Sequence, residues 1–141
     1  MNAILINNPR AQSWLLTATL LVPMALIATP TLAASAAVTT LLSDYQQQGA
    51  GSFSAPAGVA LWNLKTEGRS CTDCHGNNPT AVGQHQKTLK PIEPLAPSRN
   101  AKRLTDVKTI QKWLLRNCKS TLERECTPQE KGDFLTWLSQ Q

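Results

Sequence analysis

Apolar residues recur at helical spacing in four stretches of the chain, and segments rich in glycine and proline separate these stretches. The first stretch predicts a helix over residues 38–45, which the glycines at positions 49 and 51 would end. Its apolar face consists of Val38, Leu41, Leu42 and Tyr45. A second helix is predicted after Ser54, a suitable N-cap, with Pro56 in its first turn. The candidates on this second helix for packing against a bound group or against the C-terminal helix are Val59, Leu61 and Trp62.

The two remaining stretches lie in the C-terminal third of the chain. Thr105 or Asp106 is expected to cap a third helix that ends at Asn117. The apolar positions of this helix are Val107, Ile110, Trp113 and Leu114. A fourth helix is predicted to begin at the capping box Thr127-Pro128-Gln129-Glu130, with proline in the first turn. Its apolar residues are Phe134, Leu135, Trp137 and Leu138.

The segment between Gly76 and Arg103 has no periodic pattern. It contains Pro79, Gly83, Pro91, Pro94 and Pro97, which favour turns and irregular backbone. A long irregular segment in a small domain is expected to be either disordered or held against a ligand. No stretch of the chain has a strand pattern, and no internal repeat is present. The sequence therefore predicts an all-α class, with about four helices in one small domain.

The first 36 residues have the composition of an export signal. A mixed start with one basic residue, Arg10, precedes a mainly apolar run over residues 14–28, and small residues follow. Ala34-Ser35-Ala36 is an A-x-A cleavage motif, and Thr31-Leu32-Ala33 offers an earlier one. A retained membrane anchor is the alternative, but prolines at positions 23 and 30 interrupt the run. The sequence predicts a signal peptide over 1–36, one domain over 37–141 and a location in the bacterial periplasm.

The chain is moderately basic, with 14 Lys and Arg residues against nine Asp and Glu residues. Acidic residues are interspersed among the basic residues between Lys87 and Lys131, so no nucleic-acid partner is expected. Such a surface usually serves solubility, and it is also compatible with an acidic redox partner.

The most specific motif is Cys71-Thr72-Asp73-Cys74-His75. A C-x-x-C-H sequence is the attachment signal of c-type haem, whose vinyl groups react with the two thiols. His75 would then ligate the iron as its proximal imidazole. A zinc half-site and a C-x-x-C redox pair are the alternatives. The chain has neither a second C-x-x-C nor a βαβ pattern around the motif, so one covalent haem c is predicted.

Two further cysteines, Cys118 and Cys126, remain after haem attachment. In an exported chain a disulfide between them is expected, and closing this short loop would contribute about 2 kcal/mol. Two free buried thiols are the alternative.

The sixth coordination position of the iron has two candidate ligands in the sequence. Methionine is excluded, because both methionines lie in the predicted signal peptide. His85 lies in the irregular segment, close enough in sequence to His75 to reach round a haem, although a solvated loop histidine is the alternative. Asn117 falls on the apolar face of the third predicted helix, where a buried carboxamide needs a partner. That partner is either the iron or a backbone group at the helix end.

Several motifs in the same order resemble the sphaeroides haem protein family, and the resemblance spans nearly all of the chain from Ala57 onward. They are C-x-x-C-H with Gly76, KPIEPLAPS at 90–98, KWL and RNC within 112–118, and ECTPQEK at 125–131. The resemblance implies a monohaem cytochrome c in which His75 ligates the iron and Cys118 pairs with Cys126. It further implies that Asn117 is the distal ligand in the oxidised state.

The resemblance implies a redox-gated cytochrome that binds oxygen, nitric oxide or carbon monoxide. An amide oxygen is a hard donor that suits ferric iron better than ferrous iron, so reduction is expected to loosen Asn117. The implied electron donor is a dihaem c-type or a membrane b-type cytochrome, and a monomer is expected.

Two other functions remain open from the sequence. The first is a simple electron shuttle in which His75 and His85 permanently fill both axial positions. The second is a terminal oxidase or a nitric oxide detoxifying enzyme, for which the sequence identifies no general acid.

Overall fold

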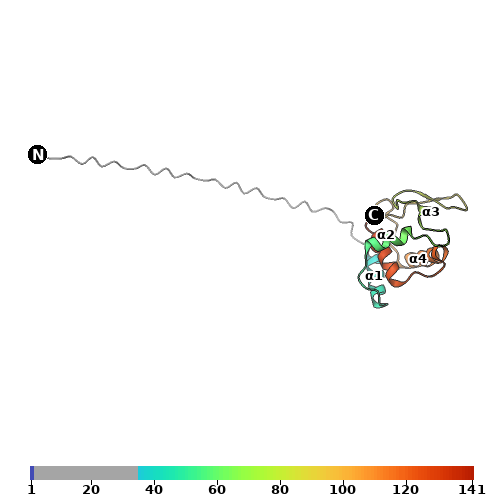
Figure 1. The fold of residues 1–141 in the computed structure, drawn as a ribbon, viewed down its shortest axis with the longest axis horizontal. Helices are drawn as coiled ribbons and strands as arrows, with labels where there is room; N and C mark the ends of the chain where they lie inside the picture. Colours follow the sequence, from blue (N-terminus) through green and yellow to red (C-terminus); the bar gives the residue numbers. More distant parts are fainter. Residues whose placement is uncertain (2–34) are drawn as a thin grey trace.

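The computed structural model describes Met1 and residues 35–141, and within this part the chain folds into five helices and a two-stranded ribbon (Figure 1). The helices are α1 (Ala36–Gln47), α2 (Ala55–Asn63), α3 (Thr72–His75), α4 (Val107–Leu122) and α5 (Pro128–Leu138). The antiparallel strands are β1 (Gly83–Gln84) and β2 (Pro91–Ile92). The predicted all-α class is confirmed. None of the helices in residues 35–141 has the length and apolar character needed to cross a membrane.

The predicted signal peptide lies outside the described residues except for Ser35 and Ala36. Ser35 is the N-cap of α1, and its Oγ accepts a hydrogen bond from the Val38 N–H at 3.2 Å. The helix therefore begins earlier than the apolar pattern predicts, because Ser35 satisfies backbone donors of its first turn.

The other helix starts follow the capping signals in the sequence. Ser54 caps α2 by accepting from the Ala57 N–H at 3.3 Å. Asp106, and not Thr105, caps α4, where it accepts from the Thr109 N–H at 2.8 Å. The capping box that begins α5 is confirmed, with both of its reciprocal hydrogen bonds present.

The C-terminal end of α4 differs from the prediction. The helix continues beyond Asn117 to Leu122, and Glu123, in the left-handed region with φ of 58°, ends it. The prediction that the helix ends at Asn117 is therefore wrong. The reason is that no glycine or proline lies between Asn117 and Leu122 to stop the helix.

Three helices share the main core. Residues of α1, α4 and α5 form one buried cluster, and α2 packs on α5 around a second cluster. The main cluster contains Ala37, Val38, Leu41, Tyr45, Ile110, Leu114 and Leu135. The second cluster is formed by Trp62, Trp137 and Leu138. Gly58 allows α2 to lie directly on α5, since a Cβ there would collide with the Asp133 carbonyl.

The segment between α3 and α4 is irregular, as predicted, but it is tied down by hydrogen bonds and runs along one side of the helices (Figure 1). The expectation of no strand is wrong, since the His85 N–H donates to the Lys90 carbonyl at 2.9 Å and closes the β1–β2 ribbon. Further along, the Leu95 and Ala96 N–H groups both donate to the Pro79 carbonyl, at 2.9 and 3.0 Å. The ribbon went unpredicted because strands of two residues are too short to show a period.

Candidate haem site

The predicted haem-attachment residues lie within one helical turn. The His75 N–H donates to the Cys71 carbonyl at 3.1 Å, and Asp73 accepts from the Ser70 N–H at 2.7 Å. Gly76, with φ of 69°, ends the turn. Both thiols of the motif are free and partly buried. The turn therefore presents two thiols and one imidazole side by side.

The His75 imidazole packs against Trp62, with the two ring centroids 5.5 Å apart. Burial lowers the pKa of His75 below its ordinary value, and the positive charge of Arg103 lowers it further. Both effects favour the neutral imidazole, which is the form that ligates a metal. Burial also raises the pKa of the Cys71 thiol to about 11, so this group is protonated at neutral pH.

Trp62 is buried between His75 and the C-terminal helix. Its ring lies 5.2 Å from that of Trp137 and 6.2 Å from that of Phe134. Its indole N–H is buried and has no hydrogen-bond partner within the described part of the chain. Leaving such a donor unpaired is costly. A haem carries carboxylate oxygens that accept hydrogen bonds, so the orphaned N–H, the two thiols and the neutral imidazole together fit this group.

The β1–β2 ribbon packs directly against the backbone of the C-x-x-C-H turn. A Cβ at Gly83 would collide with the Cys74 carbonyl and would lie 3.0 Å from the His75 Cα. An open pocket of about 630 Å³ runs along α3 and this ribbon, and Cys74, His75, Val82 and Leu89 are among its lining residues. The ribbon therefore supports the turn that carries the predicted proximal ligand.

Asn117 lies in the interior of α4, and its side chain is exposed. The expectation that it points into the apolar face together with Trp113 is wrong. The buried stripe of α4 consists of Ile110, Leu114, Cys118 and Leu122, which are spaced four residues apart. Asn117 and Trp113 lie beside this stripe, because the stripe is what packs on the rest of the core. A helix-end role for Asn117 is also excluded, since Glu123 occupies the C-cap.

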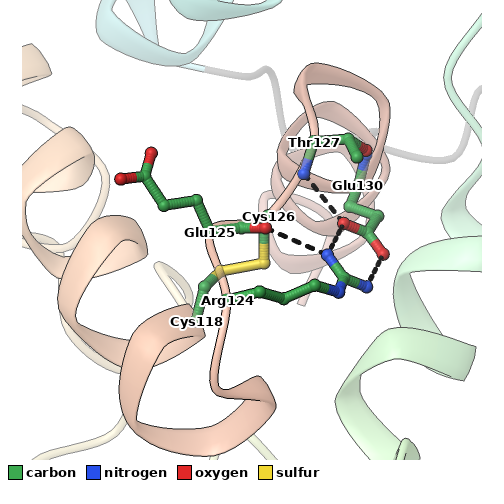
Figure 2. A network of polar contacts seen from close by, with 6 residues as sticks. All are labelled: Cys118, Arg124, Glu125, Cys126, Thr127 and Glu130. Atoms are coloured by element: carbon green, nitrogen blue, oxygen red, sulfur yellow. Dashed lines mark hydrogen bonds and ion pairs between the residues drawn. A yellow bond between two sulfur atoms is a disulfide. The ribbon is translucent and has the colours of Figure 1, made fainter.

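Cys118, the residue after Asn117, forms a disulfide with Cys126 (Figure 2). Both half-cystines are buried together with Leu122, and Leu61 of α2 packs against them. The disulfide therefore anchors the last turns of α4 to the start of α5.

Polar contacts hold the chain on the α5 side of this disulfide (Figure 2). The Arg124 guanidinium donates to both carboxylate oxygens of Glu130, at 2.6 and 2.7 Å, and to the Glu125 carbonyl at 3.0 Å. Glu130 also accepts from the Thr127 N–H at 2.8 Å. The hydrogen bond from Arg124 is the main cause that lowers the pKa of Glu130. Bidentate pairing of this kind fixes the geometry of the connection between α4 and α5.

Two features connect the C-x-x-C-H turn to the end of α4. Neighbouring residues of α2 contact the two parts, because Trp62 packs on His75 while Leu61 packs on the disulfide. An exposed ion pair also joins Arg69, just before the motif, to Glu123 at 2.7 Å. Such a pair contributes little stability, at most about 1 kcal/mol. α2 is thus a neighbour both of the turn that carries His75 and of the helix that carries Asn117.

His85, the other predicted candidate for the sixth position, lies in the turn between β1 and β2. Its side chain is exposed, and its Nδ1 accepts a hydrogen bond from the Thr88 N–H at 3.2 Å. One ring nitrogen of His85 is therefore used to shape the turn.

Sequence reasoning did not identify Gly83 or Arg103 as site residues. Arg103 donates to the carbonyls of Glu93 and Pro94, both at 2.9 Å, and its charge acts on His75. Neither residue belongs to a recognisable motif. Their positions depend on the path of the irregular segment, which the sequence pattern does not specify.

A covalent-haem motif on a small helical fold defines a c-type cytochrome. Residues 48–138 match a family described as a domain of unknown function (DUF1924). The chain is 41% identical over 126 residues to the cytochrome c-type protein SHP of Cereibacter sphaeroides. The aligned region covers 86% of this chain and 97% of that protein. The chain therefore belongs to the SHP family of c-type cytochromes, and its cofactor is covalently bound haem c. The resemblance found in the sequence is confirmed.

Solved structures show the same relationship. The structure of oxidised SHP, described as an oxygen-binding cytochrome c, matches with a TM-score of 0.68 and 42% identity, over 74% of this chain and 96% of that chain. Oxidised cytochrome c″ of Methylophilus methylotrophus matches with a TM-score of 0.63 and 31% identity, over 72% of this chain and 92% of that chain. A solution structure of cytochrome c″, described as giving insights into haem-ligand detachment, matches with a TM-score of 0.65 and 30% identity, over 74% and 93% of the two chains.

Proposed function

We propose that this protein is an exported cytochrome that binds a diatomic gas at its reduced haem and exchanges single electrons with other cytochromes. The observation that carries the proposal is the place of Asn117, which lies in the middle of α4 next to the half-cystine Cys118 and whose exposed carboxamide has no hydrogen bond to residues 35–141. The relative SHP is described as oxygen-binding, which supports the choice of ligand.

The haem in this proposal is held by the C-x-x-C-H turn. Cys71 and Cys74 would form the two thioether bonds, and His75 would ligate the iron. Haem c supplies an iron that changes its oxidation state and that offers a sixth coordination position. Packing of Trp62 on the imidazole holds the His75 ring in place.

Asn117 would hold the sixth position of the iron in the oxidised protein. An amide oxygen is a hard and weak donor that prefers ferric iron, so Asn117 would leave the iron on reduction. The adjacent disulfide restrains the helix that carries Asn117, so the side chain alone needs to move. The haem-ligand detachment described for the relative cytochrome c″ supports such a mechanism.

A setting outside the cytoplasm is supported by haem attachment, which takes place there, and by the disulfide, which requires an oxidising compartment. We propose that the protein acts in the periplasm and that it is a monomer. It receives electrons there from a dihaem c-type or a membrane b-type cytochrome.

Replacement of Asn117 by alanine tests the proposal. The oxidised Asn117→Ala protein should bind water or added anions such as cyanide at least ~10-fold faster than the wild-type protein, because no amide has to leave. The reduced protein should keep the wild-type optical spectrum and the wild-type response to carbon monoxide. Optical spectra of both oxidation states, with and without each ligand, provide the measurement.

His85→Ala is the matched control, because a permanent second histidine ligand would make the protein a simple electron shuttle. If His85→Ala opens the sixth position of the iron in both oxidation states, while Asn117→Ala opens it in neither, the gas-binding proposal is wrong. A wild-type reduced protein that does not respond to carbon monoxide would contradict it as well.

A further inference from the structure

One helix, α4, accounts for the net positive charge of residues 35–141. From Ser35 onward the chain has 13 Lys and Arg residues and nine Asp and Glu residues. Four of the basic residues and none of the acidic residues lie in α4, so the rest of this part of the chain is electrically balanced. The acids nearest in sequence, Asp106 and Glu123, are the caps at the two ends of α4.

The four basic residues of α4 form a single exposed stripe. They are Lys108, Lys112, Arg116 and Lys119, spaced four, four and three residues apart. At about 100° per residue, this spacing places them on the side of the helix opposite its buried stripe. Lys119 pairs with Glu125 at 3.0 Å, whereas the other three form no ion pair with any residue of 35–141. The stripe therefore faces solvent with its charge largely uncompensated.

Two large apolar side chains flank this basic stripe. Trp113 is 45% exposed and Leu115 is 39% exposed. The Arg116 guanidinium and the Lys112 ammonium lie 5.2 and 5.7 Å from the centre of the Trp113 ring. Stacking of this kind orders long cationic side chains before a partner arrives.

The stripe lies on the helix that carries Asn117, and Arg116 is its immediate neighbour. An α-helix is about 10 Å across, so a protein bound to the outer face of α4 would lie within about one helix diameter of the proposed sixth ligand. We infer that the outer face of α4 is the docking surface for the electron donor, and that this donor is a protein with an acidic surface around its redox centre. On contact one electron passes from the donor, which is oxidised, to this protein, which is reduced. This inference rests on the electron exchange proposed above.

Charge reversal on the stripe tests the inference with the holoprotein. The electron donors are reduced flavodoxin, an acidic protein, and the photogenerated deazariboflavin radical, a small neutral reductant. For Lys112→Glu we expect reduction by flavodoxin at low ionic strength to be about 3- to 10-fold slower than for the wild-type protein. Reduction by deazariboflavin should be unchanged. The wild-type rate with flavodoxin should fall as salt is added, and the variant rate should depend less on salt.

Lys87→Glu is the matched control, because it makes the same charge change at an exposed lysine of the β1–β2 turn. Its rate with flavodoxin should stay within about twofold of the wild-type rate. Equal slowing by Lys87→Glu and Lys112→Glu would overturn the inference, since net charge and not the stripe would then be responsible. A wild-type rate that does not depend on salt, or no reduction by flavodoxin at all, would also overturn it.

The membrane is the competing partner for a basic stripe. If Lys112→Glu abolishes binding to phosphatidylglycerol vesicles but leaves reduction by flavodoxin unchanged, the stripe binds lipid and the inference is wrong. The response of the reduced protein to carbon monoxide, measured on the same samples, reports separately on gas binding. The reduced protein could fail to respond to carbon monoxide while Lys112→Glu still slows its reduction by flavodoxin. That result would contradict the gas-binding proposal and would still support the docking surface.

Discussion

Asn117 illustrates how a single residue acquires a role from its position. Asparagine is common at helix ends, where its side chain serves the backbone. α4, however, runs on to Leu122, so the backbone around Asn117 is already hydrogen-bonded within the helix. Its carboxamide is therefore available, and the neighbouring half-cystine Cys118 restrains its helix. This combination, and not the residue type alone, supports the proposal that Asn117 ligates the iron.

Gly83 offers a second test at the scale of one residue. Gly83→Ala should lower the free energy of unfolding by roughly 1–3 kcal/mol, because the new methyl group would collide with the backbone of Cys74 and His75. Denaturant titration of the holoprotein provides the measurement. Gly51→Ala is the control, since a Cβ there makes only an ordinary contact, 3.7 Å from Gln129 Oε1. Equal stability of the two variants would show that the ribbon does not press on the haem-binding turn.

At the scale of one element, the N-terminus of α1 bears on where the chain is processed. Ser35 caps the helix, and its hydroxyl also donates to the Leu104 carbonyl just before α4. The predicted cleavage after Ala36 would remove this cap, at a cost of about 1 kcal/mol. The earlier motif, Thr31-Leu32-Ala33, would retain it.

We therefore expect the exported protein to begin at Ala34. The mass of the purified holoprotein should equal residues 34–141 plus one haem, and N-terminal sequencing should begin with Ala-Ser. A protein that begins at Ala37 would show that the contacts of Ser35 are dispensable.

The capping box of α5 makes stability depend on pH. The Arg124 hydrogen bond holds the pKa of Glu130 below its ordinary value near 4.5. A carboxylate whose pKa is lowered by folding stabilises the protein above about pH 4.5, and this contribution disappears as the pH falls through the lower, folded value. Glu130→Gln should cost about 1 kcal/mol at pH 7 and much less at pH 3. Thermal unfolding of both proteins between pH 3 and pH 7 tests this, and a difference that does not change with pH would contradict it.

At the scale of the whole molecule, the disulfide and α2 join the two parts of the site. Cys118 and Cys126 connect α4 to α5, and Leu61 of α2 packs on them next to the residue that packs on His75. A change at the disulfide is therefore expected to reach the iron through the helix that carries Asn117.

Replacement of Cys126 by serine should lower the free energy of unfolding by about 2 kcal/mol, through the lost loop constraint. It should also change the optical spectrum of the oxidised protein more than that of the reduced protein, because Asn117 is proposed to ligate only the oxidised iron. Labelling of the native wild-type protein with a thiol reagent is the complementary measurement. Haem attachment consumes the thiols of Cys71 and Cys74. Two reactive thiols in the holoprotein would therefore belong to Cys118 and Cys126 and would show that the disulfide does not form.

The signals that could be read from the sequence are local ones. Covalent haem attachment requires two cysteines and a histidine at fixed short spacing, so C-x-x-C-H predicts the cofactor without knowledge of the fold. The caps at Ser54, Asp106 and Thr127 predict helix starts for the same reason, since each cap bonds to an amide only three residues away. Those features, together with the helical class, were determined by the sequence alone.

Tertiary structure decided the features that depend on contacts between distant residues. The side of α4 that is buried is set by α1 and the disulfide, and so Trp113 and Asn117 lie beside the core and not in it. The ribbon on the haem-binding turn and the charge of Arg103 near His75 depend on the path of the irregular segment. Local periodicity carries no information on such contacts, because their energy arises only when the chain has brought the two partners together.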